Sequence, residues 1–138
     1  GATVAGDPTP VGEIAGTAAV KAFDLEVART GLVDEEAARE AGFDPVSVTI
    51  TAESRAHYYP GGEEIQITLL GDRESERVLG ASMVGREGVP KRIDTVATAL
   101  HAGMTVQQLS YLDLSYAPPF SPVWDPVLTA AKVLDGKL

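Results

Sequence analysis

The segment RAHYYPG, residues 55–61, holds the first side chains whose types could support chemistry. Two adjacent tyrosines, Tyr58 and Tyr59, cannot both point inward from a strand, so we expect at least one phenol to face outward or into a cleft. A phenol has a reference pKa of about 10, stays protonated at neutral pH and can donate a hydrogen bond to a thiolate or an oxyanion. The alternative is an edge-strand pair with no chemical role, and the residues alone leave both interpretations open.

A second aromatic segment, YLDLSYAPPFSPVWD, spans residues 111–125. It holds three of the nine prolines and four of the eight aromatic residues of the chain. Because proline lacks an amide hydrogen and fixes φ, this composition predicts a stiff loop rather than a helix or a central strand. A stiff loop presents aromatic rings that have little conformational entropy left to lose on contact, as at interface hot spots and flat ring-binding surfaces.

The alternative for this loop is that its rings fill the core of their own domain. We expect that arrangement for Tyr111 and Phe120, whereas composition favours neither interpretation for Tyr116 and Trp124. The burial of Tyr58, Tyr116 and Trp124 therefore decides between a docking role and a core role.

Other kinds of site are disfavoured by the residues present. The chain has no cysteine, which removes disulfides, thiolate metal sites and thiol nucleophiles. His57 and His101 are its only histidines and stand far apart with no ligand spacing, so we expect no metal site. The sequence has no nucleophile-elbow pattern around a serine, no G-x-G-x-x-G and no P-loop, so it shows no means of binding a nucleotide alone.

Composition is that of one acidic globular domain. The chain has 138 residues, of which 44% are hydrophobic and 22% charged. Its net charge of -9 repels phosphate backbones, so we expect no nucleic-acid partner. We also expect no membrane association and a cytoplasmic location, because no signal-peptide pattern and no apolar run of about 20 residues is visible.

The elements that must position these segments follow from apolar periodicity. Alternating apolar residues predict strands over 17–31, which holds one or two strands, and over 46–52, 65–69 and 79–83. A short helix is expected over 35–41, with Asp34 as its N-cap. Helical spacing predicts three more helices, beginning near Pro90, Thr105 and Asp125.

Strands followed by helices, rather than strict alternation, predict an α+β fold. It consists of an antiparallel meander sheet with helices packed on one face, and the other face is solvated or covered by a partner. Gly80 and Gly85 are expected to allow close approach of the backbone. Residues 1–16 are rich in Gly, Pro and Thr and predict a linker, which leaves 17–138 as the domain.

Four segments become informative when they are taken together: GTAAVKAFDLEVARTGL (16–32), RAHYYPG (55–61), RIDTVATALHAGMTVQQLSYLDLSYAPPFSPVWDPV (92–127) and AAKVL (130–134). In this order they resemble the C-terminal part of flavin-dependent pyridine nucleotide-disulfide oxidoreductases. The most similar branch contains coenzyme A-disulfide reductase, NADH oxidase and NADH peroxidase. The similarity covers residues 12–134 without large gaps, and YAPPFSPVWD is its most specific part.

The resemblance implies the flavin disulfide reductase dimerisation-domain fold and a homodimer. Members of that family carry an FAD domain with a redox cysteine, then an NAD(P)H domain, and finally a domain that supplies most of the dimer contact and reaches into the partner's active site. Only the last domain is present here. We therefore expect 1–16 to be a linker from a missing FAD-binding domain and the chain to be an excised fragment. The isolated fragment is expected to be inactive and to bind neither FAD nor NAD(P)H.

The resemblance also implies roles for single residues. Tyr58 and Tyr116 are the expected catalytic pair that lines the disulfide site. Tyr116, Ala117 and Pro118 are expected beside the flavin of the opposite subunit, where the glutathione reductase branch has a His-Pro pair. Ser54, Tyr58 and Trp124 resemble positions that contact coenzyme A, although relatives often have asparagine in place of Ser54.

The implied parent enzyme passes electrons from NAD(P)H through FAD and a cysteine to a disulfide, most specifically coenzyme A disulfide. One alternative is an NADH oxidase or peroxidase that reduces oxygen or peroxide. An alternative of another class is a free-standing dimeric interaction module without catalysis.

Overall fold

The computed structural model describes residues 14–138, so most of the predicted linker, residues 1–13, lies outside the described residues. The described part contains five strands: β1 (Ala18–Ala22), β2 (Leu25–Gly31), β3 (Pro45–Glu53), β4 (Glu64–Asp72) and β5 (Val78–Gly85). It also contains four helices: α1 (Glu35–Glu40), α2 (Val89–His101), α3 (Val106–Ser110) and α4 (Pro126–Asp135). The predicted α+β class is confirmed.

All five strands form one antiparallel sheet in the order β1-β2-β5-β4-β3. β3, β4 and β5 are the predicted meander, and segment 17–31 folds into the β1–β2 hairpin, which extends the sheet beside β5. A Cβ at Gly80 would lie 2.1 Å from the carbonyl oxygen of Leu32, and one at Gly85 would lie 2.9 Å from that of Glu64. Both distances are shorter than a real side chain permits, so the expected close approach of the backbone is confirmed.

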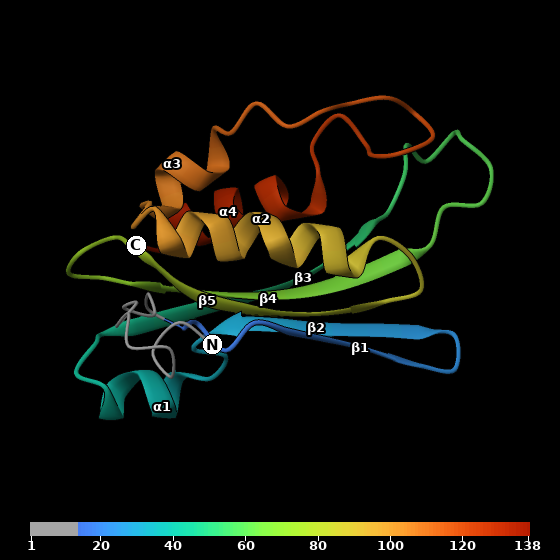
Figure 1. The fold of residues 1–138 in the computed structure, drawn as a ribbon. Helices are drawn as coiled ribbons and strands as arrows, with labels where there is room; N and C mark the ends of the chain where they lie inside the picture. Colours follow the sequence, from blue (N-terminus) through green and yellow to red (C-terminus); the bar gives the residue numbers. More distant parts are fainter. Residues whose placement is uncertain (1–13) are drawn as a thin grey trace, which may run out of the picture.

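Helices α2, α3 and α4 cover one face of the sheet and enclose the core with it (Figure 1). The apolar residues of each element follow the period of that element, so one stripe of each helix meets one face of the strands. Burying such a side chain contributes about 1.5–3 kcal/mol relative to leaving it exposed. The largest fully buried side chains of this core are Ile65, Ile67, Leu69, Met83, Ile93, Leu109 and Leu134. No helix among residues 14–138 is both long and apolar enough to cross a bilayer.

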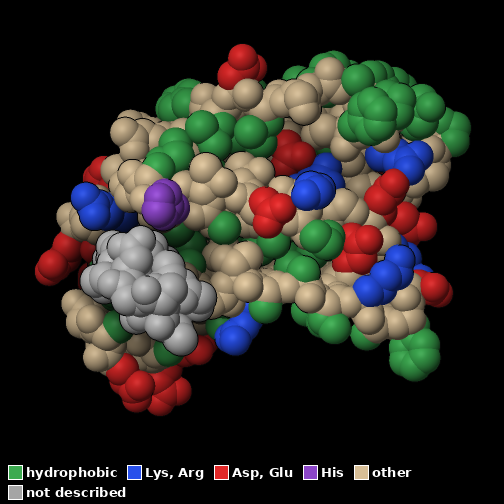
Figure 2. All heavy atoms as spheres, viewed as in Figure 1, with side chains coloured by type: hydrophobic (Ala, Val, Ile, Leu, Met, Phe, Trp, Pro, Cys, Tyr) green, Lys and Arg blue, Asp and Glu red, His purple; other side chains and the backbone are tan. Residues whose placement is uncertain are grey.

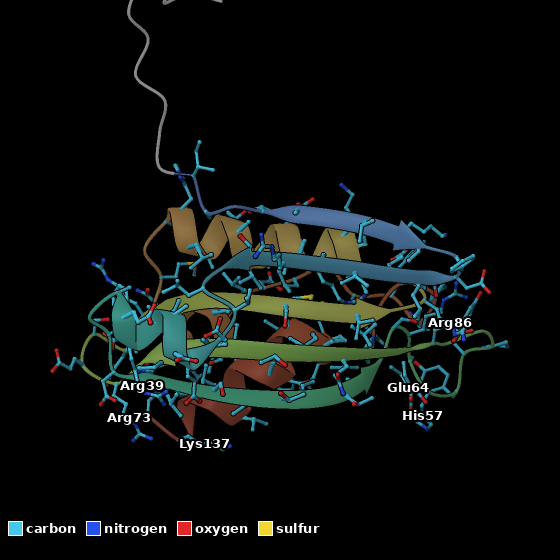
Figure 3. All side chains as sticks on the ribbon, turned by 90° about the horizontal axis from the view of Figure 1, so that it is seen from below. Arg39, His57, Glu64, Arg73, Arg86 and Lys137 are labelled. Atoms are coloured by element: carbon cyan, nitrogen blue, oxygen red, sulfur yellow. The ribbon has the colours of Figure 1, made fainter. Side chains whose placement is uncertain are left out.

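Helix α1 lies on the opposite face, at one end of the sheet (Figure 1). Ala38 of α1 packs against Leu70 and Leu79, which point away from the main core. The predicted N-cap is present, because Asp34 Oδ1 accepts a 2.8 Å hydrogen bond from the amide of Ala37. Figure 3 views this face directly and shows α1 at the end marked by Arg39 and Arg73, with the far end of the strands left uncovered by any helix.

Asp72 joins two connections at one end of the β3–β4 pair. It is 4% exposed, and its carboxylate accepts hydrogen bonds from the Asp44 amide (2.9 Å), the Ser75 amide (3.0 Å) and the Ser75 hydroxyl (2.6 Å). These bonds favour the charged form, above all the bond from the Ser75 hydroxyl, and hold the pKa of Asp72 below its usual 3.8. The charged carboxylate therefore ties the connection before β3 to the turn after β4.

We predict that Asp72→Asn lowers the free energy of unfolding by about 1–3 kcal/mol at neutral pH, because a buried charged acceptor is lost. The folded-state pKa lies below 3.8, so this stabilisation is present above pH 3.8 and is lost as the pH falls through the folded-state pKa. Urea unfolding at neutral pH and at about pH 3 should show a smaller acid loss in the variant than in the wild type.

The matched control is Asp24→Asn, since the Asp24 side chain is 87% exposed and lies 3.7 Å from Arg86. We expect this variant to keep the acid response of the wild type. Equal acid losses in Asp72→Asn and the wild type would contradict the assigned role.

Candidate functional site

The two aromatic segments meet at one end of the sheet. The first follows β3 and the second joins α3 to α4, and the two loops run side by side in Figure 1. They are joined directly by the Ala56 amide, which donates a 3.3 Å hydrogen bond to the Pro118 carbonyl. Figure 3 places His57 at this end, near Glu64 and Arg86.

Tyr58 and Tyr116 form the polar centre of this end of the molecule. Their hydroxyl oxygens lie 3.1 Å apart, although the residues are 58 positions apart in sequence. The bond with Tyr58, followed by partial desolvation, raises the pKa of Tyr116 above the ordinary 10.0. Because one hydroxyl hydrogen is used within the pair, the other remains free to donate to an external acceptor.

The tyrosine pair lies in an open groove of about 480 Å³. Trp124 lines the same groove, together with the apolar residues Ala56, Pro122 and Val123. Tyr58, Tyr116 and Trp124 are 64%, 47% and 52% exposed, so their docking role is favoured over the core role. Figure 2 shows hydrophobic side chains gathered at the upper right, where Figure 1 has the two loops.

Trp124 presents one face to a cation. The Nζ atom of Lys132 lies 3.6 Å from the centroid of the indole ring, which is the geometry of a cation–π contact. Lys132 lies on α4, which begins two residues after Trp124. The ammonium covers one face of the indole ring, and Trp124 also lines the groove of the tyrosines.

The prediction that Tyr111 and Phe120 fill the domain's own core is wrong. Tyr111 is 74% exposed and Phe120 is 77% exposed. The core below this loop is already filled by Leu109 and Val127, which are almost fully buried, so no space remains for the two rings.

Ala117 and Pro118 shape the loop beside Tyr116. The Ala117 carbonyl accepts hydrogen bonds from the amides of Phe120 (2.9 Å) and Ser121 (3.1 Å), which closes a tight turn. Both residues are half-buried, and Pro118 uses its carbonyl to hold the other loop. Their contact with a flavin stays a prediction.

Ser54 is not brought to the groove of the tyrosines. It is 2% exposed, its hydroxyl donates to Glu87 (3.2 Å) and the same oxygen accepts from the Glu63 amide (3.0 Å). It lines a second groove, of about 400 Å³, together with Glu87 and Lys91. A direct contact between Ser54 and coenzyme A stays a prediction, and it requires the hydroxyl to exchange its bond to Glu87.

Arg55 and Glu87 form a two-point ion pair behind the tyrosine loop. Arg55 Nε lies 3.1 Å from one carboxylate oxygen of Glu87, and a terminal guanidinium nitrogen contacts the other. The hydrogen bonds to Arg55 hold the pKa of Glu87 below its usual value, and the bonds to Glu87 raise the pKa of Arg55. Both groups therefore stay charged, and the pair fixes the direction in which the loop leaves β3.

Arg92 was not expected at the site, and Asp125 was expected only at the start of a helix. Arg92 is 8% exposed and its Nε lies 2.9 Å from Asp125 Oδ2. A sequence signal was present, because Arg92 stands on the apolar stripe of α2 formed by Val89, Ile93 and Val96. A charged residue at a core position indicates a buried partner.

His57 lies beside Tyr58 and lines the same groove. Its ring packs edge-on against Tyr58, with centroids 5.5 Å apart and planes at 81°. Within the described range, no three His, Asp or Glu side chains gather where they could hold a metal ion.

Comparison with known proteins connects this geometry to a family. Residues 17–126 match the pyridine nucleotide-disulphide oxidoreductase dimerisation domain. The chain is 45% identical over 134 residues to an NAD(P)H coenzyme A polysulfide/persulfide reductase of Pyrococcus horikoshii, covering 97% of this chain and 30% of that protein. It is 34% identical over 135 residues to an NADH oxidase of Methanocaldococcus jannaschii, covering 96% and 29%.

Solved structures give the same result. An NAD-dependent persulfide reductase from A. fulgidus superimposes with a TM-score of 0.86 and 47% identity, over 90% of this chain and 23% of that one. The reduced CoADR-RHD of Bacillus anthracis superimposes with a TM-score of 0.84 and 40% identity, over 88% of this chain and 22% of that one. The chain spans less than a third of the length of each of these relatives. It belongs to the dimerisation-domain family of the pyridine nucleotide-disulphide oxidoreductases.

Proposed function

We propose that this domain completes the active site of a homodimeric, FAD- and NAD(P)H-dependent reductase that acts on a coenzyme A disulfide or persulfide. In the dimer, the groove of Tyr58, Tyr116 and Trp124 lies against the flavin cleft of the opposite subunit. The observation that carries the proposal is the exposed pair of phenol hydroxyls, 3.1 Å apart, inside an apolar groove.

The chemistry of disulfide reduction fits these two phenols. Cleavage of a sulfur–sulfur bond by two electrons converts both sulfurs to thiolates, and the one that leaves gains stability from a hydrogen-bond donor. Phenols that keep their protons at neutral pH are suitable donors, and the raised pKa of Tyr116 keeps that hydroxyl protonated. Tyr58 and Tyr116 orient the leaving sulfur and stabilise its charge as it develops.

The residues of this chain fit one edge of a flavin and not the whole cofactor. The loop at Tyr116, Ala117 and Pro118 is stiff and half-buried, and it can lie against a flat ring system without losing much entropy. The chain has no glycine-rich loop that could hold a dinucleotide phosphate. When FAD is bound in the parent enzyme, it supplies the electrons, and this loop closes the site from the other subunit.

Trp124 and Lys132 support coenzyme A as the carrier of the sulfur. Coenzyme A combines apolar and ring surface with phosphates; Trp124 lines the groove with an indole ring, and the ammonium of Lys132 lies 3.6 Å from the centroid of that ring. Ser54 belongs to this proposal as a contact in the second groove, made after its bond to Glu87 is exchanged.

A second candidate is an NADH oxidase or peroxidase, which the relative from Methanocaldococcus jannaschii favours. Turnover of the full-length enzyme with coenzyme A disulfide, oxygen and peroxide as separate acceptors distinguishes the two. A free-standing interaction module is the candidate of another class. A coding sequence with an upstream G-x-G-x-x-G fingerprint and a redox cysteine would rule it out.

We predict that Tyr58→Phe combined with Tyr116→Phe lowers kcat/KM of the full-length enzyme for coenzyme A disulfide by about 10- to 1,000-fold, because a donor to the leaving sulfur is lost. Steady-state kinetics with NAD(P)H oxidation as the readout checks this. Tyr111→Phe is the matched control, since Tyr111 is 74% exposed and is not part of the groove. Unchanged disulfide turnover in the double variant would remove the assigned role.

We also predict that the 138-residue chain dimerises on its own. Phe120 and Trp124 are 77% and 52% exposed on a stiff loop, and such a patch is stabilised by contact with a second copy. Sedimentation velocity over a concentration series should show a monomer–dimer equilibrium that persists at high salt, because apolar contact is not screened. A monomer at the highest concentrations would contradict this prediction.

A further inference from the structure

Both tyrosine loops are anchored to the core through one buried side chain, Arg92 of α2. This residue lies one turn into the helix and is 8% exposed. Its guanidinium lines the second groove, beside Ser54 and Phe120, where the two loops begin and end. The contacts of this one group therefore decide how the two loops are placed relative to each other.

The guanidinium donates to backbone oxygens of both loops. Arg92 Nη2 lies 2.9 Å from the carbonyl oxygen of Ser54, where the first loop leaves β3, and 3.5 Å from that of Phe120 in the second loop. Arg92 Nη1 lies 3.3 Å from the carbonyl oxygen of Gly88, at the start of its own helix. One planar group thus spans three backbone segments.

Asp125 extends this network to α4. Its Oδ2 accepts from Arg92 Nε at 2.9 Å and from the Ser121 hydroxyl at 3.1 Å. Its Oδ1 accepts from the Val127 amide at 2.9 Å and caps α4. The same carboxylate therefore fixes the last part of the proline-rich loop to the helix that follows it.

The two carbonyl groups that Arg92 holds in the loops, those of Ser54 and Phe120, lie close in sequence to the two tyrosines. Ser54 lies four residues before Tyr58, and Phe120 lies four residues after Tyr116. Arg92 thus holds each loop at a backbone position four residues from its tyrosine. The two loops are also linked directly, by the 3.3 Å backbone bond from Ala56 to Pro118 and by the 3.1 Å bond between the two phenols.

Arginine is required by this geometry. Its planar fork donates in several fixed directions at once, whereas the compact ammonium of lysine is a point charge on a flexible stem. A buried ion pair is weak evidence for stability, since its desolvation cost offsets much of the attraction. A fully bonded network instead restricts the backbone to one arrangement.

We propose that Arg92 is a positioning residue: its buried guanidinium fixes the two loops so that the hydroxyls of Tyr58 and Tyr116 meet. The inference rests on the proposed function for the role of the phenols, but not for the geometry itself. Arg92 acts through the backbone and touches neither phenol.

The test uses Arg92→Lys in the 138-residue chain and follows the titration of Tyr116 by NMR of ring-labelled tyrosine. Tyr58→Phe gives the reference for an unpaired Tyr116, whose pKa then falls because the bond that raises it is lost. We expect Arg92→Lys to lower the pKa of Tyr116, as Tyr58→Phe does, while circular dichroism shows an intact fold. Glu53, Arg55 and His57 line the same groove and are unchanged in the variant, so their influence is the same in both titrations.

Arg86→Lys is the matched control, because Arg86 is 54% exposed and its ion-pair distances are 3.7 and 3.9 Å. We expect no change in the Tyr116 titration there. A folded Arg92→Lys chain with the wild-type titration overturns the proposal. If that chain does not fold, Asp125→Asn replaces it, since asparagine keeps the helix cap and removes only the charge.

Asp125→Asn is expected to lower the pKa of Tyr116 too. A folded Asp125→Asn chain in which Tyr116 titrates as in the wild type overturns the proposal. If neither variant folds, Arg92 supports the fold as a whole, which also overturns a specific role at the loops. The titration involves no electron acceptor. A shifted titration together with unchanged disulfide turnover in full-length Arg92→Lys would therefore reject the proposed function and leave the positioning role intact.

Discussion

A charge inside a protein is unfavourable unless it is paired and its hydrogen-bond donors are used, and the end of this domain is organised around one such charge. The guanidinium of Arg92 contacts the end of β3, the proline-rich loop, the cap of α4 and the first turn of α2. The apolar core between the sheet and the helices is formed by other side chains, some of them neighbours of Arg92 on α2. In our proposal the arrangement of the two loops depends on this guanidinium, and Tyr58, Tyr116 and Trp124 line the groove that the loops form.

The groove that the two loops form is open to solvent. The groove presents two phenols and an indole ring to solvent, and its walls are mostly apolar. The sequence itself has no cysteine and no glycine-rich phosphate loop. An exposed apolar surface of this kind gains stability when a second molecule covers it. The family to which the chain belongs is defined by dimerisation, which is consistent with such a partner.

Local patterns in the sequence were sufficient for the fold class, the meander and the helix caps at Asp34, Thr105 and Asp125. Each of these depends on residues a few positions apart, where periodicity and capping chemistry are decisive. The meeting of the two loops depends on segments far apart in the chain, and only the resemblance to a family pointed to it. The exposure of Tyr111 and Phe120 was missed because composition does not show that Leu109 and Val127 already fill the core. The burial of Ser54 and the contacts of Arg92 were missed because a single sequence does not reveal which carbonyls a buried side chain will meet.

The sheet order has a consequence for the order in which the domain assembles. β3, β4 and β5 are joined by short connections, whereas β2 pairs with β5 across the whole meander and Tyr58 meets Tyr116 across 58 positions. The entropy lost on closing a loop grows with its length, so the meander forms most readily and the long-range contacts come after it. The groove is thus completed only when α2 and α4 have docked. By the same reasoning it lies among the first regions to open when the native state fluctuates, so its local stability is lower than that of the strands that support it.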